Sequence, residues 1–204
     1  MKTILIYIIG CLIAYCLGSI SPSLLFSKMK KTDLRKDGSG NLGASNTTLL
    51  LGWKFGVLVG LIDILKGTIP VLLARFLFPG LSYLPFAVAL CAVLGHIFPF
   101  YLKGKGGKGF ATFMGIILGL DWRFFIIIGV TVIIVTLVTD YIVIGTFTAI
   151  FSFPIWLILI SNVKWSFLLI LPLTVIIFVK HIENIGRIIR KEEKGISHTF
   201  KKKK

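Results

Sequence analysis

Acidic residues are scarce in this chain of 204 residues: Asp and Glu together number eight, against 23 Lys and Arg. Hydrophobic residues make up 56% of the sequence and the mean hydropathy is +0.94, values outside the usual range of soluble globular proteins. The net charge of +15 does not indicate nucleic-acid binding, because the cations flank apolar segments instead of lining a soluble domain. The composition therefore predicts an integral membrane protein whose cations set its orientation and attract anionic lipid.

Several kinds of catalytic and metal site are also missing. Cys11, Cys16 and Cys91 lie in apolar runs without metal-ligand spacing, which predicts neither a disulfide nor a metal site. The chain contains no Walker A loop, no Gly-x-Ser-x-Gly nucleophile elbow and no His-x-x-x-x-Asp pair. We therefore expect no metal, no cofactor and no covalent acyl-enzyme intermediate.

Long apolar runs predict an all-α membrane protein with about seven transmembrane helices. The hydrocarbon core of a bilayer, about 30 Å thick, needs about 20 mainly apolar helical residues. The candidate segments are residues 4–25, 53–77, 83–102, 110–120, 124–139, 142–160 and 165–180. The fourth is too short to span, so we expect it to be tilted or to be a half-helix that begins at Gly106 or Gly107. The first is expected to be kept as a membrane helix, since it lacks the features of a cleaved signal peptide.

The distribution of cations predicts the orientation. If every segment crosses the membrane, residues 28–51, residues 103–108 and the C-terminal tail lie on one face, and nearly all Lys and Arg lie there. The positive-inside rule makes this face cytoplasmic, with the N-terminus outside and the C-terminus inside. We expect residues 1–204 to form a single multi-pass domain of the plasma membrane, ending in a basic cytoplasmic tail over residues 191–204.

A loop rich in lysine and glycine precedes the short fourth segment. Glycine lets the backbone come close to a ligand, and the first N–H groups of a helix lack internal partners, so this loop suits a phosphate. The alternative is a basic loop that only orients the protein. The candidate phosphate-binding residues are Lys105, Gly106, Gly107, Lys108, Gly109 and Thr112.

A second polar stretch, residues 33–46, alternates glycine with hydroxyl and amide side chains. Such an array can wrap a phosphate or a polyol, although the same residue types are common in ordinary turn-rich linkers. Its candidate ligand-binding residues are Ser39, Gly40, Asn41, Ser45 and Asn46.

Ionisable residues occur inside or at the ends of two apolar segments. Asp63 and Lys66 are three residues apart on one helix face, which indicates either a functional pair or a structural salt bridge. His181, Asn184 and Arg187 recur every three residues, so a continuing helix presents them on one side. A guanidinium suits phosphate binding, but a snorkelling basic helix end is the alternative.

Taken in order, these stretches resemble the PlsY family of bacterial membrane acyl-phosphate:glycerol-3-phosphate acyltransferases. The resemblance is carried by residues 33–46 with 62–67, by 95–100 with Lys-Gly-Gly-Lys-Gly at 105–109 and Ala-Thr at 111–112, and by His-Ile-Glu-Asn-Ile-Gly-Arg at 181–187. It implies a seven-helix membrane fold with a cytoplasmic active site. It also implies transfer of an acyl chain from acyl-phosphate to the 1-hydroxyl of glycerol-3-phosphate, which makes lysophosphatidate for phospholipid synthesis.

The resemblance also implies roles for the candidate residues. His181, Asn184 and Lys108 are expected to be catalytic, and the remaining candidates, including Arg187, to bind substrate. We expect Asp63, Lys66 and His96 to hold the substrate-binding residues in place without contacting the substrate themselves. The implied partners are acyl-phosphate, glycerol-3-phosphate and membrane lipid, with no nucleic acid, and we expect a monomer. We expect the phosphate of the donor to accept the proton of the attacking hydroxyl, with His181 as the alternative base.

The sequence departs from the family pattern in the first helix, where the proline of Gly18-Ser-Ile-Ser-Pro-Ser23 is one place late, at Gly104, and at two positions that bear on the site. Leu49 stands where the family usually has an arginine, and Val143 where it has a serine. The alternatives are a divergent or catalytically silent paralogue acting on another phosphorylated acceptor, or an anion-binding membrane protein such as a channel. A channel predicts polar residues through the membrane on several helices, whereas only Asp63 and Lys66 are deeply placed.

Overall fold

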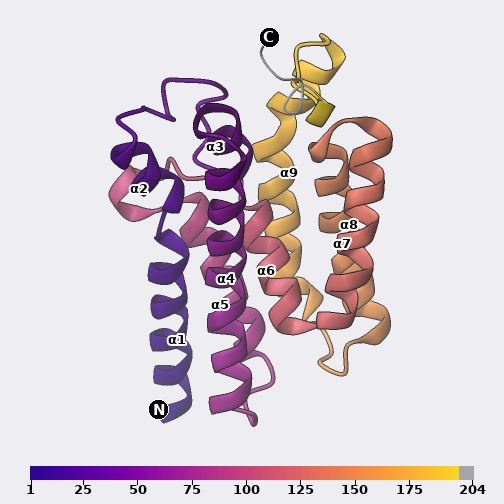
Figure 1. The fold of residues 1–204 in the computed structure, drawn as a ribbon. Helices are drawn as coiled ribbons and strands as arrows, with labels where there is room; N and C mark the ends of the chain where they lie inside the picture. Colours follow the sequence, from indigo (N-terminus) through magenta and orange to yellow (C-terminus); the bar gives the residue numbers. More distant parts are fainter. Residues whose placement is uncertain (198–204) are drawn as a thin grey trace. The chain divides into compact units, whose positions relative to one another are not determined.

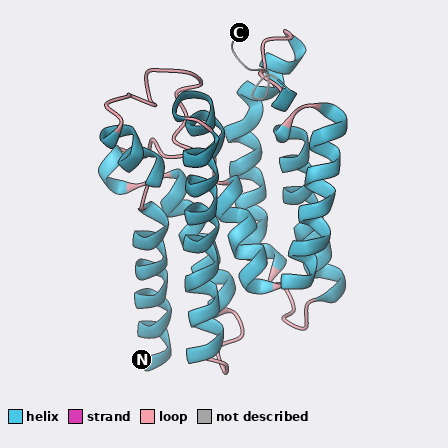
Figure 2. Cartoon of the chain, in the orientation of Figure 1, coloured by secondary structure: helices cyan, strands magenta, loops and turns pink. Residues whose placement is uncertain are grey.

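The computed structural model of this protein describes residues 1–197, in which helices are joined by loops and turns and no strand occurs (Figures 1 and 2). They form two compact units, Met1–Leu120 and a second unit from Asp121 onward. The first contains α1 (Lys2–Ser19), α2 (Pro22–Met29), α3 (Ala44–Leu51), α4 (Trp53–Leu77), α5 (Leu84–Ile97), the 3-10 turn η1 (Phe100–Leu102) and α6 (Phe110–Leu120). The second contains α7 (Trp122–Thr139), α8 (Ile142–Ile160) and α9 (Phe167–Ile189). The predicted tail residues 198–204 lie outside the described residues.

Within residues 1–197, six helical stretches are long and apolar enough to cross a membrane. They are Lys2–Met29, Trp53–Leu77, Leu84–Leu102, Trp122–Thr139, Ile142–Ile160 and Phe167–Ile189. The fourth predicted segment is the shorter apolar helix α6. The described residues are thus all-helical, with six candidate spans and one short apolar helix, and the prediction of about seven crossings stays a prediction.

The predicted segment 4–25 lies within the candidate span Lys2–Met29, but this span is interrupted between two helices. Helix α1 ends at Ser19, and Ile20 is extended, with φ −58° and ψ 123°. The next helix begins at Pro22, because a proline fits the first turn of a helix, where no backbone donor is needed. Ser21 caps α2 by accepting a hydrogen bond from the Leu24 N–H at 3.4 Å.

Two other boundaries differ from the sequence-based expectation. Residues 44–51, which lie between two predicted membrane segments, form helix α3. Helix α6 begins at Phe110, not at Gly106 or Gly107, because those two glycines fold back onto the end of α5.

Small residues let the helices of the first unit pack closely. Helix α1 packs against α5, and α4 packs against α3, α5 and α6. A Cβ atom at Gly18 would lie 2.8 Å from the carbonyl carbon of Ala92, and one at Gly115 equally close to that of Ile64. Such contacts are typical of membrane helices, which associate by close packing. Arg75 Nη1 donates to the Gly119 carbonyl at 2.7 Å and so closes the C-terminal end of α6.

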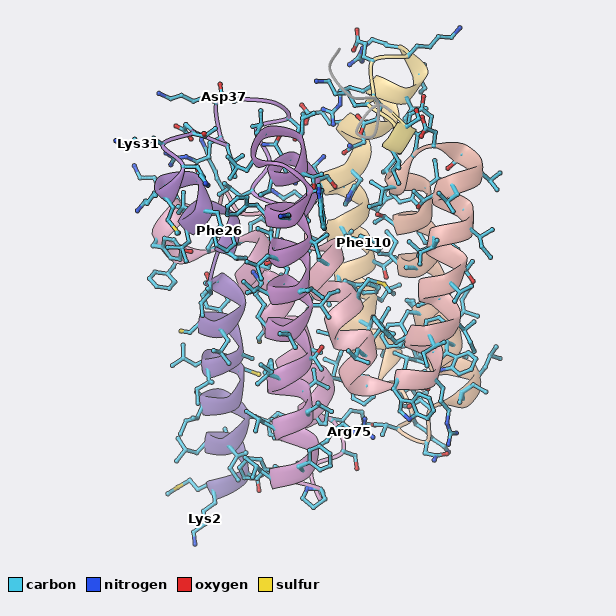
Figure 3. The ribbon with its side chains drawn as sticks, viewed as in Figure 1. Lys2, Phe26, Lys31, Asp37, Arg75 and Phe110 are labelled. Carbon is cyan, nitrogen blue, oxygen red and sulfur yellow. The ribbon has the colours of Figure 1, made fainter. Side chains whose placement is uncertain are left out.

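The charged ends of the first unit are separated by the length of its helices. Lys31 and Asp37 lie at the end that carries α2 and α3, while Lys2 and Arg75 lie at the opposite end (Figure 3). The polar stretch of residues 33–46 therefore belongs to the end of this unit that is opposite Lys2 and Arg75.

The second unit is held by an aspartate cap and an aromatic cluster. Asp121 accepts hydrogen bonds from the Arg123 and Phe124 N–H groups at 3.0 and 3.1 Å, and its other oxygen accepts from the indole of Trp156 at 2.9 Å. Phe124 stacks on Trp156 with centroids 4.8 Å apart. Thr174 of α9 donates to the Ile150 carbonyl of α8 at 2.8 Å. This hydrogen bond joins the first half of α9 to α8.

Candidate functional site

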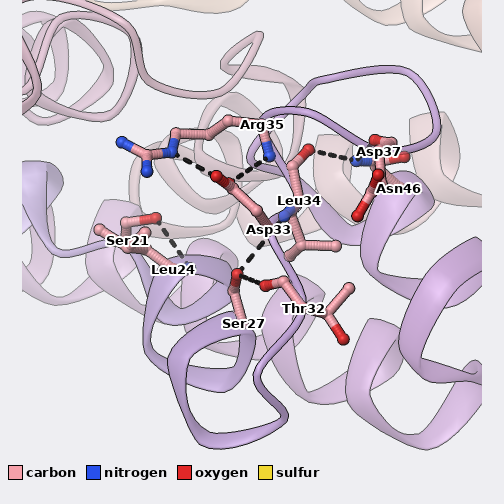
Figure 4. Close-up of polar contacts among 9 residues, drawn as sticks. All are labelled: Ser21, Leu24, Ser27, Thr32, Asp33, Leu34, Arg35, Asp37 and Asn46. Carbon is pink, nitrogen blue, oxygen red and sulfur yellow. Dashed lines mark hydrogen bonds and ion pairs between the residues drawn. The ribbon is translucent and has the colours of Figure 1, made fainter.

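Asn46, in the first turn of α3, closes the polar stretch of residues 33–46. Its Nδ2 donates to the Leu34 carbonyl at 2.9 Å and to the Asp37 carbonyl at 3.3 Å (Figure 4). Its Oδ1 accepts from the Ser39 N–H at 2.9 Å. Asn46 is buried, and a buried amide satisfied in this way organises its loop. The structure therefore gives Asn46 a loop-forming role, while Ser39, Gly40 and Ser45 are exposed.

Charged and hydroxyl side chains hold the start of the same stretch. Arg35 Nε donates to Asp33 Oδ1 at 3.2 Å, and this hydrogen bond lowers the pKa of the Asp33 carboxyl (Figure 4). The Ser27 hydroxyl donates to the Thr32 carbonyl and accepts from the Leu34 N–H. The hydrogen bonds of Ser27 thus fix the direction in which the chain leaves α2. The Arg35 side chain is held by Asp33, two residues before it.

The lysine-glycine loop folds back on α5. The Gly106 N–H donates to the Ile97 carbonyl at 3.1 Å and the Gly107 N–H to the His96 carbonyl at 3.2 Å. The expectation that these two glycines offer bare N–H groups to a phosphate is therefore wrong. A Cβ atom at Gly106 would lie 2.6 Å from Cδ of Pro99, so glycine is needed there for close packing.

The two polar stretches meet at Gly107. A Cβ atom at this position would lie 2.8 Å from the Leu42 carbonyl oxygen and 2.8 Å from Cε1 of His96. Gly107 itself is buried, and Lys108, which follows it, is partly exposed. Residues 33–46 thus contact the loop that leads into α6. A ligand site formed by both stretches requires such a contact.

The first turn of α6 adds donors to this region. Gly109, at φ +95°, ends the loop, and its carbonyl accepts the first helical hydrogen bond from the Phe113 N–H at 2.8 Å. The Thr112 hydroxyl is fully buried and has no hydrogen-bond partner among residues 1–197. The start of a helix favours an anion, since its first N–H groups lack internal acceptors.

A buried polar chain of Lys66, Asp63 and His96 lies behind the loop. The predicted pair forms, with Lys66 Nζ 2.8 Å from Asp63 Oδ1, and His96 Nδ1 is 3.4 Å from the same oxygen. Lys66 Nζ also donates to the Ile20 carbonyl at 2.7 Å, which is accessible because α1 ends there. The Nε2 side of His96 faces Gly107. This chain connects the α1–α2 break to the lysine-glycine loop through α4 and α5.

Replacing Gly107 by alanine is expected to lower the free energy of unfolding by about 1 to 3 kcal/mol, since the added methyl group would overlap the His96 ring and press on the Leu42 carbonyl. Thermal unfolding in detergent measures this. Gly129→Ala is the matched control, because a Cβ atom there meets no heavy atom within 4 Å. Equal melting temperatures for the two variants would contradict the packing at Gly107.

The candidate residues of the second unit lie along α9, where His181 and Asn184 are buried. The His181 Nδ1 is 2.8 Å from the Ile177 carbonyl, which can only accept, so Nδ1 carries the proton. The Nε2 of a neutral ring is then an acceptor. The edge of the imidazole packs near Phe147, with centroids 6.1 Å apart.

Glu193 is a residue that the sequence analysis missed. Its carboxylate accepts from Asn184 Nδ2 at 2.6 Å and from Arg187 Nε at 2.5 Å. Glu183 Oε2 also lies 3.7 Å from Arg187 Nη1. The available signal was the scarcity of acid: with eight acidic residues in the whole chain, a glutamate six positions after Arg187 stands out.

The two departures from the family pattern lie on different helices. Val143, in the first turn of α8, is 1% exposed, and Leu49 is a partly exposed residue of α3. Lys54, at the start of α4, is exposed and has its ammonium 6.0 Å from the Trp53 ring centroid. Among residues 1–197 there is no group of three or more His, Cys, Asp or Glu side chains that could hold a metal ion.

Comparison with known proteins gives one consistent result. The model of the family described as glycerol-3-phosphate acyltransferase matches residues 8–191. Glycerol-3-phosphate acyltransferase 1 of Oceanobacillus iheyensis is 38% identical over 206 residues, which cover 97% of this chain and 98% of that protein. The glycerol-3-phosphate acyltransferase of Coxiella burnetii (strain Dugway 5J108-111) is 41% identical over 184 residues, covering 89% of this chain and 94% of that protein.

Solved structures are similar over almost the same length. A crystal structure of PlsY, an integral membrane glycerol 3-phosphate acyltransferase in its glycerol 3-phosphate form, superposes with a TM-score of 0.88 at 33% identity, covering 93% of this chain and 95% of that chain. The lysophosphatidic acid form of PlsY gives a TM-score of 0.85 at 32% identity, covering 94% and 96% of the two chains.

Proposed function

The chain belongs to the glycerol-3-phosphate acyltransferase family, and from this premise we propose that it transfers an acyl chain from acyl-phosphate to the 1-hydroxyl of glycerol-3-phosphate. The product is lysophosphatidate. Crystal structures of PlsY in a glycerol 3-phosphate form and a lysophosphatidic acid form support this substrate and product. Both compact units belong to the enzyme, since the family match runs from residue 8 to residue 191.

The observation that carries the proposal is the junction of the two polar stretches at Gly107. It brings exposed Ser39 and Gly40 onto the same end of the first unit as Lys108 and the first turn of α6. Ammonium groups and helix N–H groups are the donors that a phosphate requires. We assign phosphate binding to Lys108, with Lys105 and the exposed residues of the first stretch as further contacts.

The second unit supplies groups suited to the glycerol part of the acceptor. His181 has an acceptor nitrogen and Asn184 has an amide, both on the same side of α9. A hydroxyl can donate to either. We assign these two side chains to orienting the acceptor, because positioning of the attacking oxygen is itself a large part of such catalysis.

The reaction needs no covalent intermediate. The oxygen of the 1-hydroxyl attacks the acyl carbonyl carbon, an ester C–O bond forms, and the bond between the acyl carbon and the phosphate oxygen breaks. The leaving phosphate takes the hydroxyl proton, so inorganic phosphate and lysophosphatidate are released. Lysine charge and N–H groups stabilise the developing negative charge.

Replacing His181 by alanine is expected to reduce turnover by about ten- to a hundredfold, because the side chain orients the acceptor while the donor phosphate takes the proton. Steady-state rates and glycerol-3-phosphate binding, measured together, test this. A loss above about a thousandfold with unchanged binding would make His181 the general base and overturn the substrate-assisted step.

One assay tests the function as a whole. The purified protein is incubated with palmitoyl-phosphate and radiolabelled glycerol-3-phosphate, and lysophosphatidate is scored, with palmitoyl-coenzyme A in a parallel reaction. Product from palmitoyl-phosphate alone is the expected result. Absence of product from a folded protein rejects the proposal and favours a silent or divergent paralogue, the reading that Leu49 and Val143 support.

We propose the orientation in the membrane from the distribution of charge. The excess of Lys and Arg in residues 28–51 and 103–108 supports placing this end of the first unit in the cytoplasm, with the N-terminus outside. We propose a multi-pass protein of the plasma membrane that works as a monomer on acyl-phosphate delivered from the bilayer.

A further inference from the structure

Glu193 connects two candidate site residues from a segment that has already left α9. Its Oε1 accepts from Asn184 Nδ2 at 2.6 Å, and its Oε2 accepts from Arg187 Nε at 2.5 Å. The Glu193 side chain is 14% exposed. Hydrogen bonds to an ionised carboxylate at these lengths are among the stronger ones in proteins.

A turn of the backbone brings Glu193 back against α9. After α9 ends at Ile189, Lys191 takes a left-handed conformation with φ 58°. The N–H groups of Glu192 and Glu193 then both donate to the Arg187 carbonyl, at 2.8 and 3.2 Å. The turn therefore holds the Glu193 carboxylate against the side of the last helical turns.

The far end of the same segment is anchored on the α7–α8 turn. The Ile196 N–H donates to the Asp140 carbonyl at 2.9 Å, and the Ser197 N–H and hydroxyl donate to the Asp140 carboxylate at 2.8 and 2.7 Å. Gly195 lies against that carboxylate, and a Cβ atom there would be 2.9 Å from Asp140 Oδ1. Residues 191–197 are thus fixed at both ends, and Glu193 is preorganised.

The chemistry of this contact sets the direction of the Asn184 amide. A carboxylate only accepts hydrogen bonds, so Asn184 has to turn Nδ2 toward Glu193 and Oδ1 away from it. The Oδ1 side has acceptor polarity, which suits a hydroxyl donor and disfavours a phosphate oxygen. Arg187, meanwhile, has Glu193 at 2.5 Å and Glu183 at 3.7 Å, so its charge is compensated by two carboxylates.

We propose that Glu193 is a positioning residue for acyl transfer: it fixes the Asn184 amide so that Oδ1 faces the acceptor hydroxyl, and Arg187 holds Glu193 in place. The inference rests on the proposed function and deepens it, because it separates the hydroxyl-orienting amide from the phosphate-binding lysines. It also changes the role assigned to Arg187: instead of binding substrate, Arg187 holds the Glu193 carboxylate in place.

The first test is Glu193→Gln. Glutamine keeps the size but has both a donor and an acceptor, so the Asn184 amide is no longer held in one direction. We expect kcat/KM for glycerol-3-phosphate to fall by about ten- to thirtyfold, with the affinity for inorganic phosphate unchanged. Glu192→Gln is the matched control, because Glu192 is 57% exposed and pairs with exposed Arg190.

The second test exchanges the two polar groups. Asn184→Asp alone places two carboxylates within contact distance, where they repel each other. We expect its kcat/KM to be lower than that of Glu193→Gln. Adding Glu193→Gln lets the new amide donate to the new carboxylate, whose other oxygen keeps acceptor polarity toward the substrate. We expect the double variant to regain at least about tenfold in kcat/KM over Asn184→Asp, a recovery that a purely structural role would not produce.

The outcomes separate this inference from the proposed function. Equal kinetics for Glu193→Gln and Glu192→Gln, or a double variant no better than Asn184→Asp, overturn the inference while wild-type product formation upholds the function. A wild-type protein that binds glycerol-3-phosphate but forms no product overturns the function. The ratio of glycerol-3-phosphate affinities between the two glutamine variants then decides the inference. A wild-type protein that binds none overturns both.

Discussion

Replacing Asp63 by alanine is expected to lower the free energy of unfolding by about 3 to 5 kcal/mol. Asp63 is 1% exposed and Lys66 is 7% exposed, and their charged atoms are 2.8 Å apart. Without the carboxylate, the Lys66 ammonium stays buried with the neutral Ile20 carbonyl as its remaining hydrogen-bond acceptor among the described residues. A loss of this size is a large part of the stability of an ordinary domain. Thermal or denaturant unfolding in detergent measures it.

A second variant shows whether the buried charge is the cause. Changing Lys66 to methionine in the Asp63→Ala background removes the uncompensated ammonium, and most of the lost stability should return. Asp37→Ala is the control, because Asp37 is exposed and its replacement should change stability by no more than about 0.5 kcal/mol. An Asp63→Ala protein that melts with the wild type would contradict the buried ion pair.

The largest expected effect on activity is at Lys108. Replacing Lys108 by alanine should lower kcat/KM for glycerol-3-phosphate by about a hundred- to a thousandfold, as removal of a group that stabilises transition-state charge does elsewhere. Lys108 follows Gly107, where the two polar stretches meet, and precedes the first turn of α6. Steady-state kinetics with palmitoyl-phosphate as donor provide the measurement.

Lys103→Ala is the matched control for the loss of one loop cation. Lys103 is exposed, belongs to the same loop and ends the 3-10 turn in a left-handed conformation. If general electrostatic attraction of anions were the cause, both variants would lose activity equally, and both losses would shrink in salt. A selective loss at Lys108 supports direct phosphate binding.

Much of the helical framework was predictable because apolar length is a property of consecutive residues. The predicted limits 53–77, 110–120 and 142–160 coincide with α4, α6 and α8. The Asp63–Lys66 pair was also predictable, since a spacing of three residues places two side chains on one helix face. The membrane class followed from hydropathy alone, because no soluble fold could bury so many apolar side chains.

The sequence predicted which types of residue form the candidate site, but it did not predict which groups these residues contact. Lys and Gly at 103–109 predicted anion chemistry, yet Gly106 and Gly107 use their N–H groups on α5 carbonyls. Asn46 was expected to contact substrate, yet its amide closes residues 34–39. In both cases the backbone of another segment competes for the same hydrogen bonds, and that competition is invisible along the chain.

The amino-acid order alone therefore accounts for the membrane-spanning helices, the basic face and the local pairs of charges, because these depend on hydropathy and on spacings within one helical turn. The break at Ile20, which offers its carbonyl to Lys66 46 positions away, depends on packing between elements. So do the approach of Leu42 to Gly107 and the return of Glu193 to Asn184. Each of these contacts joins separate segments, and only the folded chain brings such groups within hydrogen-bonding distance.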